Sequence, residues 1–197
     1  LIKAFKSAGW YVIGQDIDPN AIALKFCDEI GTIDTPADLI LPTRDAELKS
    51  GSHRCSDETI DICCDKFKFY KWCKENGFRT PEIFFCKPRI SESGKKTEIV
   101  FQEFIDGYIE YSIDIFLTFD SKVINCVPRS RDKIVMGEAW VSTTVEAPML
   151  IEESINLSKA LGLIGHSVIQ CFWDGVNRPI IIECNARFGG QSHLSIK

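Results

Sequence analysis

The chain has 197 residues, of which 45% are hydrophobic and 26% are charged, and its formal net charge is −5. This composition is typical of a soluble globular protein with one ordinary domain or two small ones. No apolar run approaches the roughly 20 residues that span a bilayer, and no cluster of Lys and Arg offsets the negative charge. We therefore expect neither a membrane nor a nucleic acid among its partners.

Nine cysteines make up an odd and high count, so that complete internal pairing is impossible. Cys86 and Cys171 lie inside the apolar segments "IFFC" and "VIQCFW", where a free thiol behaves as a small hydrophobic group. The first ten residues also lack a cleavable signal peptide. These features predict a reducing, cytoplasmic location. Four further cysteines near His53 lack the short paired spacing of a zinc site, namely Cys55, Cys63, Cys64 and Cys73.

The two ends of the sequence predict that the natural chain is longer. It begins at Leu1 without a Met, within a helical pattern, and it ends while an apolar pattern is still running.

Helices and strands alternate in the first 58 residues. The spacing in "LIKAFKSAGW" predicts a helix that Gly9 ends, and "YVIGQDID" reads as a strand. Asp18 and Pro19 have the order of a helix cap and first turn, leading into "NAIALKF", and "DLILP" predicts a further short strand. The pattern predicts a small α/β layer whose first strand precedes this sequence.

Strands dominate from about residue 59 onward. A basic, aromatic helix runs through "DKFKFYKWCKENG" between its cap Asp65 and Gly77, and two strands follow in "EIFFCKPR" and "EIVFQEFI". A hairpin forms from "IEYSIDIFLTF" and "KVINCVPR", an amphipathic helix covers "MLIEESINLSKALG", and a last hairpin joins "HSVIQCFW" to "RPIIIECN". We expect an α+β domain over residues 59–197.

The segment "IIIECNARFGG" changes abruptly from apolar to polar. Glu183 and Asn185 project from one face of a strand, and Arg187 follows two residues later. Carboxylate and amide oxygens suit Mg²⁺, and the planar guanidinium suits phosphate. The alternative is a strand end that simply reaches solvent. The pattern favours a metal–phosphate site.

Other polar residues interrupt apolar strands. Lys87 ends one strand, and the strand after Gly107 carries three polar residues on one face, namely Glu110, Ser112 and Asp114. The alternative for Lys87 is a side chain that extends into water. The alternative for the other three residues is a solvated face of a half-buried hairpin, and the alternation by itself favours this second interpretation. Gln170 has the alternative of an edge residue bonded to backbone, but the last hairpin can bring it beside Glu183. That pairing predicts three oxygen donors on one surface.

Three segments, "CKPR", "QEFIDGYIEYSID" and "VIQCFWDGVNRPIIIECNARFGG", resemble successive signatures of the ATP-grasp superfamily, most closely its carbamoyl-phosphate-synthase large-subunit-like branch. The resemblance runs from about Asp65 to the end, and "IGQDID" with "LPTRDAEL" is similar to the small domain that precedes the grasp. It implies a Rossmann-like pre-ATP-grasp domain over residues 1–58 and an ATP-grasp domain over residues 59–197. It also implies an ATP-dependent ligase, using Mg²⁺ or Mn²⁺, that joins a carboxylate to an amine or ammonia through an acyl phosphate.

The resemblance implies a role for each matching residue. Lys66 and Lys87 would contact the ATP phosphates, and Glu110 would accept hydrogen bonds from the ribose. The hinge that reads the adenine edge would be Glu103, Phe104 and Ile105. The Mg²⁺ ligands would be Gln170, Glu183 and Asn185. The arginines on the phosphate or substrate side would be Arg129, Arg131 and Arg187.

One departure from the family concerns the segment after Lys87. The family has a glycine-rich loop and a helix there, whereas only "PRISESGKKT" precedes the next strand. Ten residues cannot hold both elements. Either the protein has lost this lid or the lid, which would follow Arg89, is missing from the sequence, and we expect the second.

Two other functions compete with the ligase. A nucleotide-binding subunit without turnover would have no need of the metal ligands, and so they favour the enzyme. A dehydrogenase would use Asp16 as a ribose ligand, but the glycine-rich fingerprint is not visible. The acceptor is not identified; Trp140 joins the arginines as a neighbour of the substrate, and His193 is either a supporting group or a surface residue. Dimers are common in the superfamily, while the sequence leaves the oligomeric state open.

Overall fold

The computed structural model describes residues 1–32, 34–52, 54–90, 96–192 and 195, with backbone alone at residues 85–90 and 96–99. The chain divides into two compact units, Leu1–Ile40 and Leu41–Lys197. Residues 41–58 thus group with the chain that follows them. The domain boundary expected at residue 58 stays a prediction.

The first unit contains less regular structure than its sequence predicts. Helix α1 spans Ile2–Ser7, and Gly9 follows it with φ of +87°, as a helix-ending glycine should. The two strands β1 (Ile13–Gly14) and β2 (Glu29–Ile30) pair in parallel, with the 3₁₀ helix η1 (Ile22–Phe26) between them.

Two expectations for this unit are wrong in detail. Asp18 accepts a hydrogen bond from the Asn20 amide at 2.9 Å, which makes a local turn, and the helix that follows is 3₁₀ and begins only at Ile22. The strand expected in "DLILP" is not formed: residues 38–42 belong to none of the strands in the described part of the chain.

Helices open the second unit. The 3₁₀ helix η2 spans Asp45–Ser50, α2 spans Asp57–Cys64 and α3 spans Lys66–Glu75. The Asp65 carboxylate accepts the Phe67 and Lys68 amides, both at 2.9 Å, and Gly77 ends the turn after α3 with φ of +74°. The expected cap and stop of α3 are therefore confirmed.

Strands β3 (Ile83–Ile90) and β4 (Lys96–Gln102) form an antiparallel hairpin in which Ile90 lies opposite Lys96. The question of a lid after Arg89 falls partly on residues 91–95, outside the described residues. It stays a prediction.

The main sheet has five antiparallel strands in the order β7-β6-β5-β8-β9. Their bounds are Ile109–Leu117 for β5, Val123–Val135 for β6, Glu138–Thr144 for β7, Gly165–Trp173 for β8 and Ile180–Asn185 for β9. The expected hairpins β5–β6 and β8–β9 are present. Strand β7 was not predicted from the sequence. It pairs with β6, which is longer than expected, across a turn at Met136 and Gly137 with φ of +52° and +83°.

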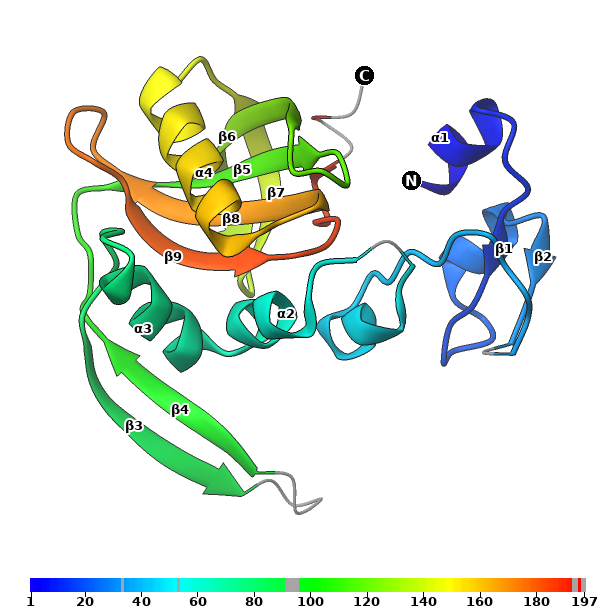
Figure 1. The fold of residues 1–197 in the computed structure, drawn as a ribbon, viewed down its shortest axis with the longest axis horizontal. Coiled ribbons are helices and arrows are strands. Elements are labelled where there is room, and N and C mark those ends of the chain that lie inside the picture. The colour runs from blue at the N-terminus through cyan, green and yellow to red at the C-terminus, as the bar shows by residue number, and fades with distance from the viewer. Residues whose placement is uncertain (33, 53, 91–95, 193–194, 196–197) are drawn as a thin grey trace. The chain divides into compact units, whose positions relative to one another are not determined.

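Helices cover one face of this sheet. Helix α4 (Pro148–Leu161), which Gly162 ends with φ of +69°, lies along the sheet, and α2 and α3 lie beside β9 (Figure 1). All three contribute to a single core with the apolar residues of β5, β8 and β9, among them Ile113, Ile169 and Ile181. Since side chains alternate along a strand, the opposite face of the sheet carries the polar residues.

Among the described residues, no helix is long and apolar enough to cross a membrane.

Candidate nucleotide and metal site

The strand register brings the polar residues onto one face of the sheet. Gln170 on β8 lies opposite Glu183 on β9 and opposite Ser112 on β5, which confirms the pairing expected for the last hairpin. Ser112 also lies opposite Arg129 on β6. Four strands therefore contribute to the same surface.

Arg131 links two of the predicted ligand-binding residues. Its Nη1 donates to Glu110 Oε1 and, at 2.7 Å, to Gln170 Oε1, and its Nη2 donates to the Gly137 carbonyl at 2.5 Å. The Arg131 side chain is 6% exposed, and its Nε is buried with no hydrogen-bond partner in the described chain. A buried guanidinium with an unused donor has capacity for another acceptor.

The end of β9 carries a second group of contacts. Asn185 Nδ2 donates to Glu183 Oε1 at 3.0 Å, and Lys66 Nζ lies 3.4 Å from Glu183 Oε2. Arg187 Nη2 donates to Asn185 Oδ1 at 3.3 Å. Lys66 is the first residue of α3, so the Asp65 cap that fixes this helix also places the lysine at the end of β9.

Arg187 is held in place by an ion pair. Its Nε donates to Asp45 Oδ1 at 2.5 Å and its Nη2 to Asp45 Oδ2 at 3.3 Å, the two-point contact that a planar guanidinium favours. The hydrogen bond to Asp45 raises the pKa of Arg187 above its ordinary value. The side chain keeps 24% of its surface exposed, so it remains accessible to a ligand.

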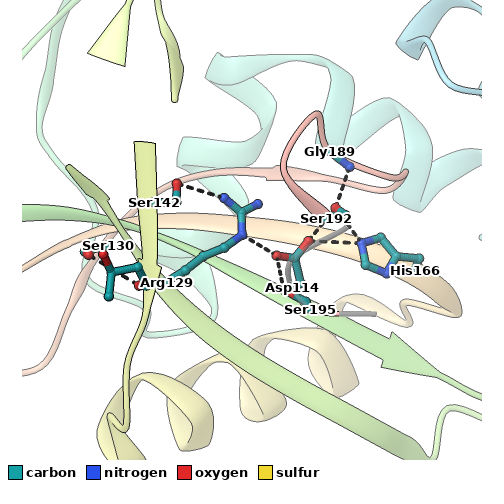
Figure 2. A network of polar contacts seen from close by, with 9 residues as sticks. Asp114, Arg129, Ser130, Ser142, His166, Gly189, Ser192 and Ser195 are labelled. Carbon is teal, nitrogen blue, oxygen red and sulfur yellow. Dashed lines mark hydrogen bonds and ion pairs between the residues drawn. The ribbon is translucent and has the colours of Figure 1, made fainter. Parts of the chain in front are cut away.

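Arg129 lies in a different, buried environment. Its Nε donates to Asp114 Oδ2 at 2.6 Å, and the two side chains are 3% and 2% exposed. His166 Nε2 lies 3.1 Å from Asp114 Oδ1, and the Ser192 and Ser195 hydroxyls also donate to this carboxylate (Figure 2). Burial opposes ionisation of Asp114, but the hydrogen bonds from His166, Arg129 and Ser192 outweigh it and leave its pKa below the ordinary value.

This network shows that one alternative was wrong. The polar face of β5 is not solvated, because Ser112 and Asp114 are each 3% exposed. Residues from β6, β8 and the segment after β9 cover it.

The other predicted residues whose side chains the structure describes do not join these contacts. Glu103 follows β4, where its amide donates to the Glu82 carbonyl at 2.7 Å, and Phe104 is 86% exposed. Trp140 on β7 is 63% exposed. The side chain of Lys87 and the whole of His193 lie outside the described residues.

Sequence reasoning missed three residues of the site: Asp45, His166 and Ser192. Asp45 lies within "LPTRDAEL" and begins η2, but the ion pair joins it to a residue 142 positions away. His166 and Ser192 have no recognisable spacing with Asp114, from which they are separated by 52 and 78 positions. Helix α2 was also missed, although Ser56 followed by Asp57 and Glu58 is a regular N-terminal signal.

A helix-covered antiparallel sheet whose polar face gathers lysine, arginine, carboxylate and amide groups, preceded by a β-hairpin, defines the ATP-grasp class of fold. The model of the family described as "ATP-grasp in the biosynthetic pathway with Ter operon" matches residues 95–197, more than half of the chain. The chain belongs to this ATP-grasp family, which confirms the resemblance to the ATP-grasp superfamily, while the branch within it stays a prediction. No curated protein sequence matches the chain significantly.

Solved structures share the fold at low sequence identity. N5-carboxyaminoimidazole ribonucleotide synthetase from Thermotoga maritima has a TM-score of 0.69 at 16% identity, with 98% of this chain and 67% of that chain covered. Biotin carboxylase from Campylobacter jejuni, in a βγ-ATP complex, has a TM-score of 0.67 at 13% identity, with 98% of this chain and 64% of that chain covered. An L-amino acid ligase from Bacillus licheniformis has a TM-score of 0.68 at 16% identity, with 98% of this chain and 64% of that chain covered. The chain thus spans about two thirds of the length of these proteins.

Proposed function

We propose that this protein is an ATP- and Mg²⁺-dependent ligase that joins a carboxylate to an amine or to ammonia through an acyl phosphate. One observation carries the proposal: three cations from three elements converge on the three predicted metal ligands. Arg131 contacts Gln170, Lys66 contacts Glu183 and Arg187 contacts Asn185. A site that holds Mg²⁺ together with phosphates would need oxygen ligands and cationic side chains close to one another.

The donor set fits Mg²⁺. Gln170, Glu183 and Asn185 offer hard oxygen atoms, and they carry one formal negative charge between them. A site with so few charged ligands suits an ion that keeps several waters and takes its remaining ligands from phosphates. Among the described residues there is no cluster of three His, Cys, Asp or Glu that competes for a metal.

The residues of the chain act by position and charge. Lys66, Arg131 and Arg187 would turn from the ligand oxygens to the phosphate oxygens, and Glu110 would be released to the ribose hydroxyls. Bound Mg²⁺ supplies neutralisation of charge on the phosphates. The hinge Glu103–Ile105 and Lys87 keep their implied roles toward the adenine and the phosphates.

The proposed reaction has two steps. A carboxylate oxygen of the acceptor attacks the γ-phosphorus, and the bond to the β–γ bridging oxygen breaks with its electron pair leaving on ADP. The amine or ammonia nitrogen then attacks the acyl carbon, and phosphate leaves with the electrons of the carbon–oxygen bond. The nitrogen loses a proton in this step. Arg187, at the end of β9, would stabilise the charge on the phosphoryl group.

Within the superfamily we propose the carbamoyl-phosphate-synthase-like branch, on the resemblance of "CKPR", "QEFIDGYIEYSID" and "VIQCFWDGVNRPIIIECNARFGG" to its signatures. The substrates are small molecules, and Trp140 is exposed on the strand next to Arg131. The free thiols of the described cysteines accord with a reducing, cytoplasmic location. A homodimer is the assembly proposed.

The test measures Mg²⁺-dependent ADP release by the full-length protein. Pools of amino acids and small carboxylates are supplied with ammonia or an amine, and release that depends on one acid identifies the acceptor. Glu183→Gln should lower this activity at least about 100-fold, because the one formally charged ligand of the metal, which is also the ion-pair partner of Lys66, becomes a neutral amide. The matched control is Glu138→Gln, since Glu138 is an exposed carboxylate on the edge strand.

Three results would count against the proposal. ATP binding without turnover against any pool would point instead to a nucleotide-binding subunit. Equal activity of the Glu183→Gln and Glu138→Gln variants would remove Glu183 from the site. Unfolding of Glu183→Gln, checked by circular dichroism, would assign the residue to the fold instead.

A further inference from the structure

The segment after β9 is anchored to the polar face of the sheet by a buried network. Ser192 Oγ accepts a hydrogen bond from the Gly189 amide at 2.9 Å and donates to Asp114, and His166 Nε2 lies 3.0 Å from it (Figure 2). Ser192 is 2% exposed. One hydroxyl group therefore joins the turn after Arg187 to β5 and β8.

An aromatic contact holds the same segment one residue after Arg187. The Phe188 ring stacks on the His166 ring with a centroid separation of 4.2 Å and an interplanar angle of 5°. His166 is itself fixed by Asp114. The backbone that carries Arg187 is thus held from one side by Phe188 and Ser192, while Asp45 holds the guanidinium from the other.

Arg129 belongs to this buried network and does not line an open binding site. Its charge is neutralised by Asp114 at 2.6 Å, and its side chain is 3% exposed. The turn at Gly189 packs closely on this network: a Cβ added there would be 3.1 Å from a methyl group of Val168, 3.3 Å from Ser192 Oγ and 3.9 Å from Arg129 Nη2. Glycine at this position lets the turn pack closely on the network.

We propose that the cluster of Asp114, Arg129, His166 and Ser192 positions Arg187 for the terminal phosphate of the nucleotide. These are positioning residues, which act through the turn after β9 and do not touch the ligand. This assigns Arg129 a different task from the direct contact with phosphate or substrate that the resemblance implies. The inference rests on the proposed nucleotide site.

The consequence is a selective effect on the terminal phosphate. If the turn is displaced, Arg187 loses its alignment, whereas Glu110 and the hinge lie on other segments and keep theirs. Affinity for ADP should therefore persist while the additional affinity for a third phosphate falls. A residue that only stabilises the fold would change both affinities together.

The experiment compares Mg²⁺-ADP with Mg²⁺-AMP-PNP, a nonhydrolysable ATP analogue, by calorimetry on the full-length protein. Ser192→Ala should lower the preference for the triphosphate roughly tenfold, the loss corresponding to one charge-assisted hydrogen bond, with ADP affinity unchanged. Phe188→Leu should act in the same direction without disturbing a buried hydrogen bond. Ser192→Thr, which keeps the hydroxyl group, should restore the preference.

The matched control is Ser167→Ala. Ser167 is the neighbour of His166 on β8, it is fully buried, and its hydroxyl has no hydrogen-bond partner within the described residues. This variant should bind both nucleotides like the unaltered protein. Thermal unfolding of each variant verifies that the fold is retained.

The outcomes separate the two proposals. Failure of the unaltered protein to bind either nucleotide would overturn the proposed function itself. Binding with an unchanged triphosphate preference in both Ser192→Ala and Phe188→Leu would overturn the positioning role and leave the proposed function standing. Equal weakening of ADP and the analogue would assign the network to stability alone.

Discussion

Replacing Asp114 by asparagine should destabilise the protein more than any exposed carboxylate replacement on the same sheet. Asp114 accepts from Arg129, His166, Ser192 and Ser195, and asparagine leaves one acceptor oxygen for these donors. Arg129 would remain 3% exposed without a counter-charge. Breaking one partner of a buried ion pair costs about 3–5 kcal/mol, and the retained oxygen favours the lower end, about 3 kcal/mol.

The measurement is urea unfolding, supported by a fall in melting temperature of roughly 10 °C for a chain of this size. Asp132→Asn is the matched control, because this carboxylate also accepts from two hydroxyl groups, of Ser130 and Thr143 at 2.6 Å each, but is exposed. The control should lose less than about 1 kcal/mol. Similarly small decreases in the free energy of unfolding of both variants would refute the idea that the buried ion pair causes the larger loss of stability.

A second substitution tests whether the unpaired charge of Arg129 causes this loss of stability. Adding Arg129→Met to Asp114→Asn removes the uncompensated charge, so the double variant should be no less stable than Asp114→Asn alone. Additive losses in the two variants would mean that the network contributes through packing instead.

Three further predictions concern a proposed metal ligand, the pH dependence of stability and the reactivity of the cysteines. Because a carboxylate binds Mg²⁺ more tightly than an amide, Gln170→Glu should lower the Mg²⁺ concentration needed for half-maximal nucleotide binding, measured by calorimetry across a Mg²⁺ series; a rise would contradict the metal role. Since the pKa of Asp114 is lowered by folding, its stabilisation is present above the unfolded pKa of about 3.9 and is lost as the pH falls through the lowered value. The stability difference between the unaltered protein and Asp114→Asn should therefore shrink in urea titrations below about pH 4, and a constant difference would refute the charge argument. Burial raises the pKa of the Cys73 and Cys171 thiols to about 12, so native protein should alkylate at exposed Cys64 well before them, as mass spectrometry of iodoacetamide-treated protein would show.

Local signals predicted the elements that depend on local contacts. The helix after Asp65 was predicted because its cap and its terminal glycine lie in the sequence next to it. The pairing of Gln170 with Glu183 was predicted because a short turn fixes the register of a hairpin. In contrast, "DLILP" has an apolar pattern but forms none of the paired strands of the described chain, and an apolar run alone does not make a strand.

Contacts between distant segments explain what the sequence did not reveal. The alternation in β5 reads equally as a solvated face or a buried polar face, and the choice depends on Arg129, His166 and Ser192, which arrive from 15, 52 and 78 positions away. The same holds for Asp45, whose partner Arg187 is fixed only by tertiary structure. Residue types thus predicted the oxygen donors and the cations of the candidate site, while their present pairing needed the structure.

The pairing of cations with carboxylates bears on how nucleotide and Mg²⁺ would bind to the proposed site. Three ion pairs, Lys66–Glu183, Arg131–Glu110 and Arg187–Asp45, leave the site without formal net charge. In the proposed site, phosphate oxygens that drew the cations away would leave these carboxylates without compensation, and a divalent cation would restore the balance while the phosphates paired with the cations. Nucleotide without Mg²⁺, or Mg²⁺ without nucleotide, completes only half of this exchange. Binding of the two should therefore be strongly coupled, and by linkage each raises the affinity for the other by the same factor.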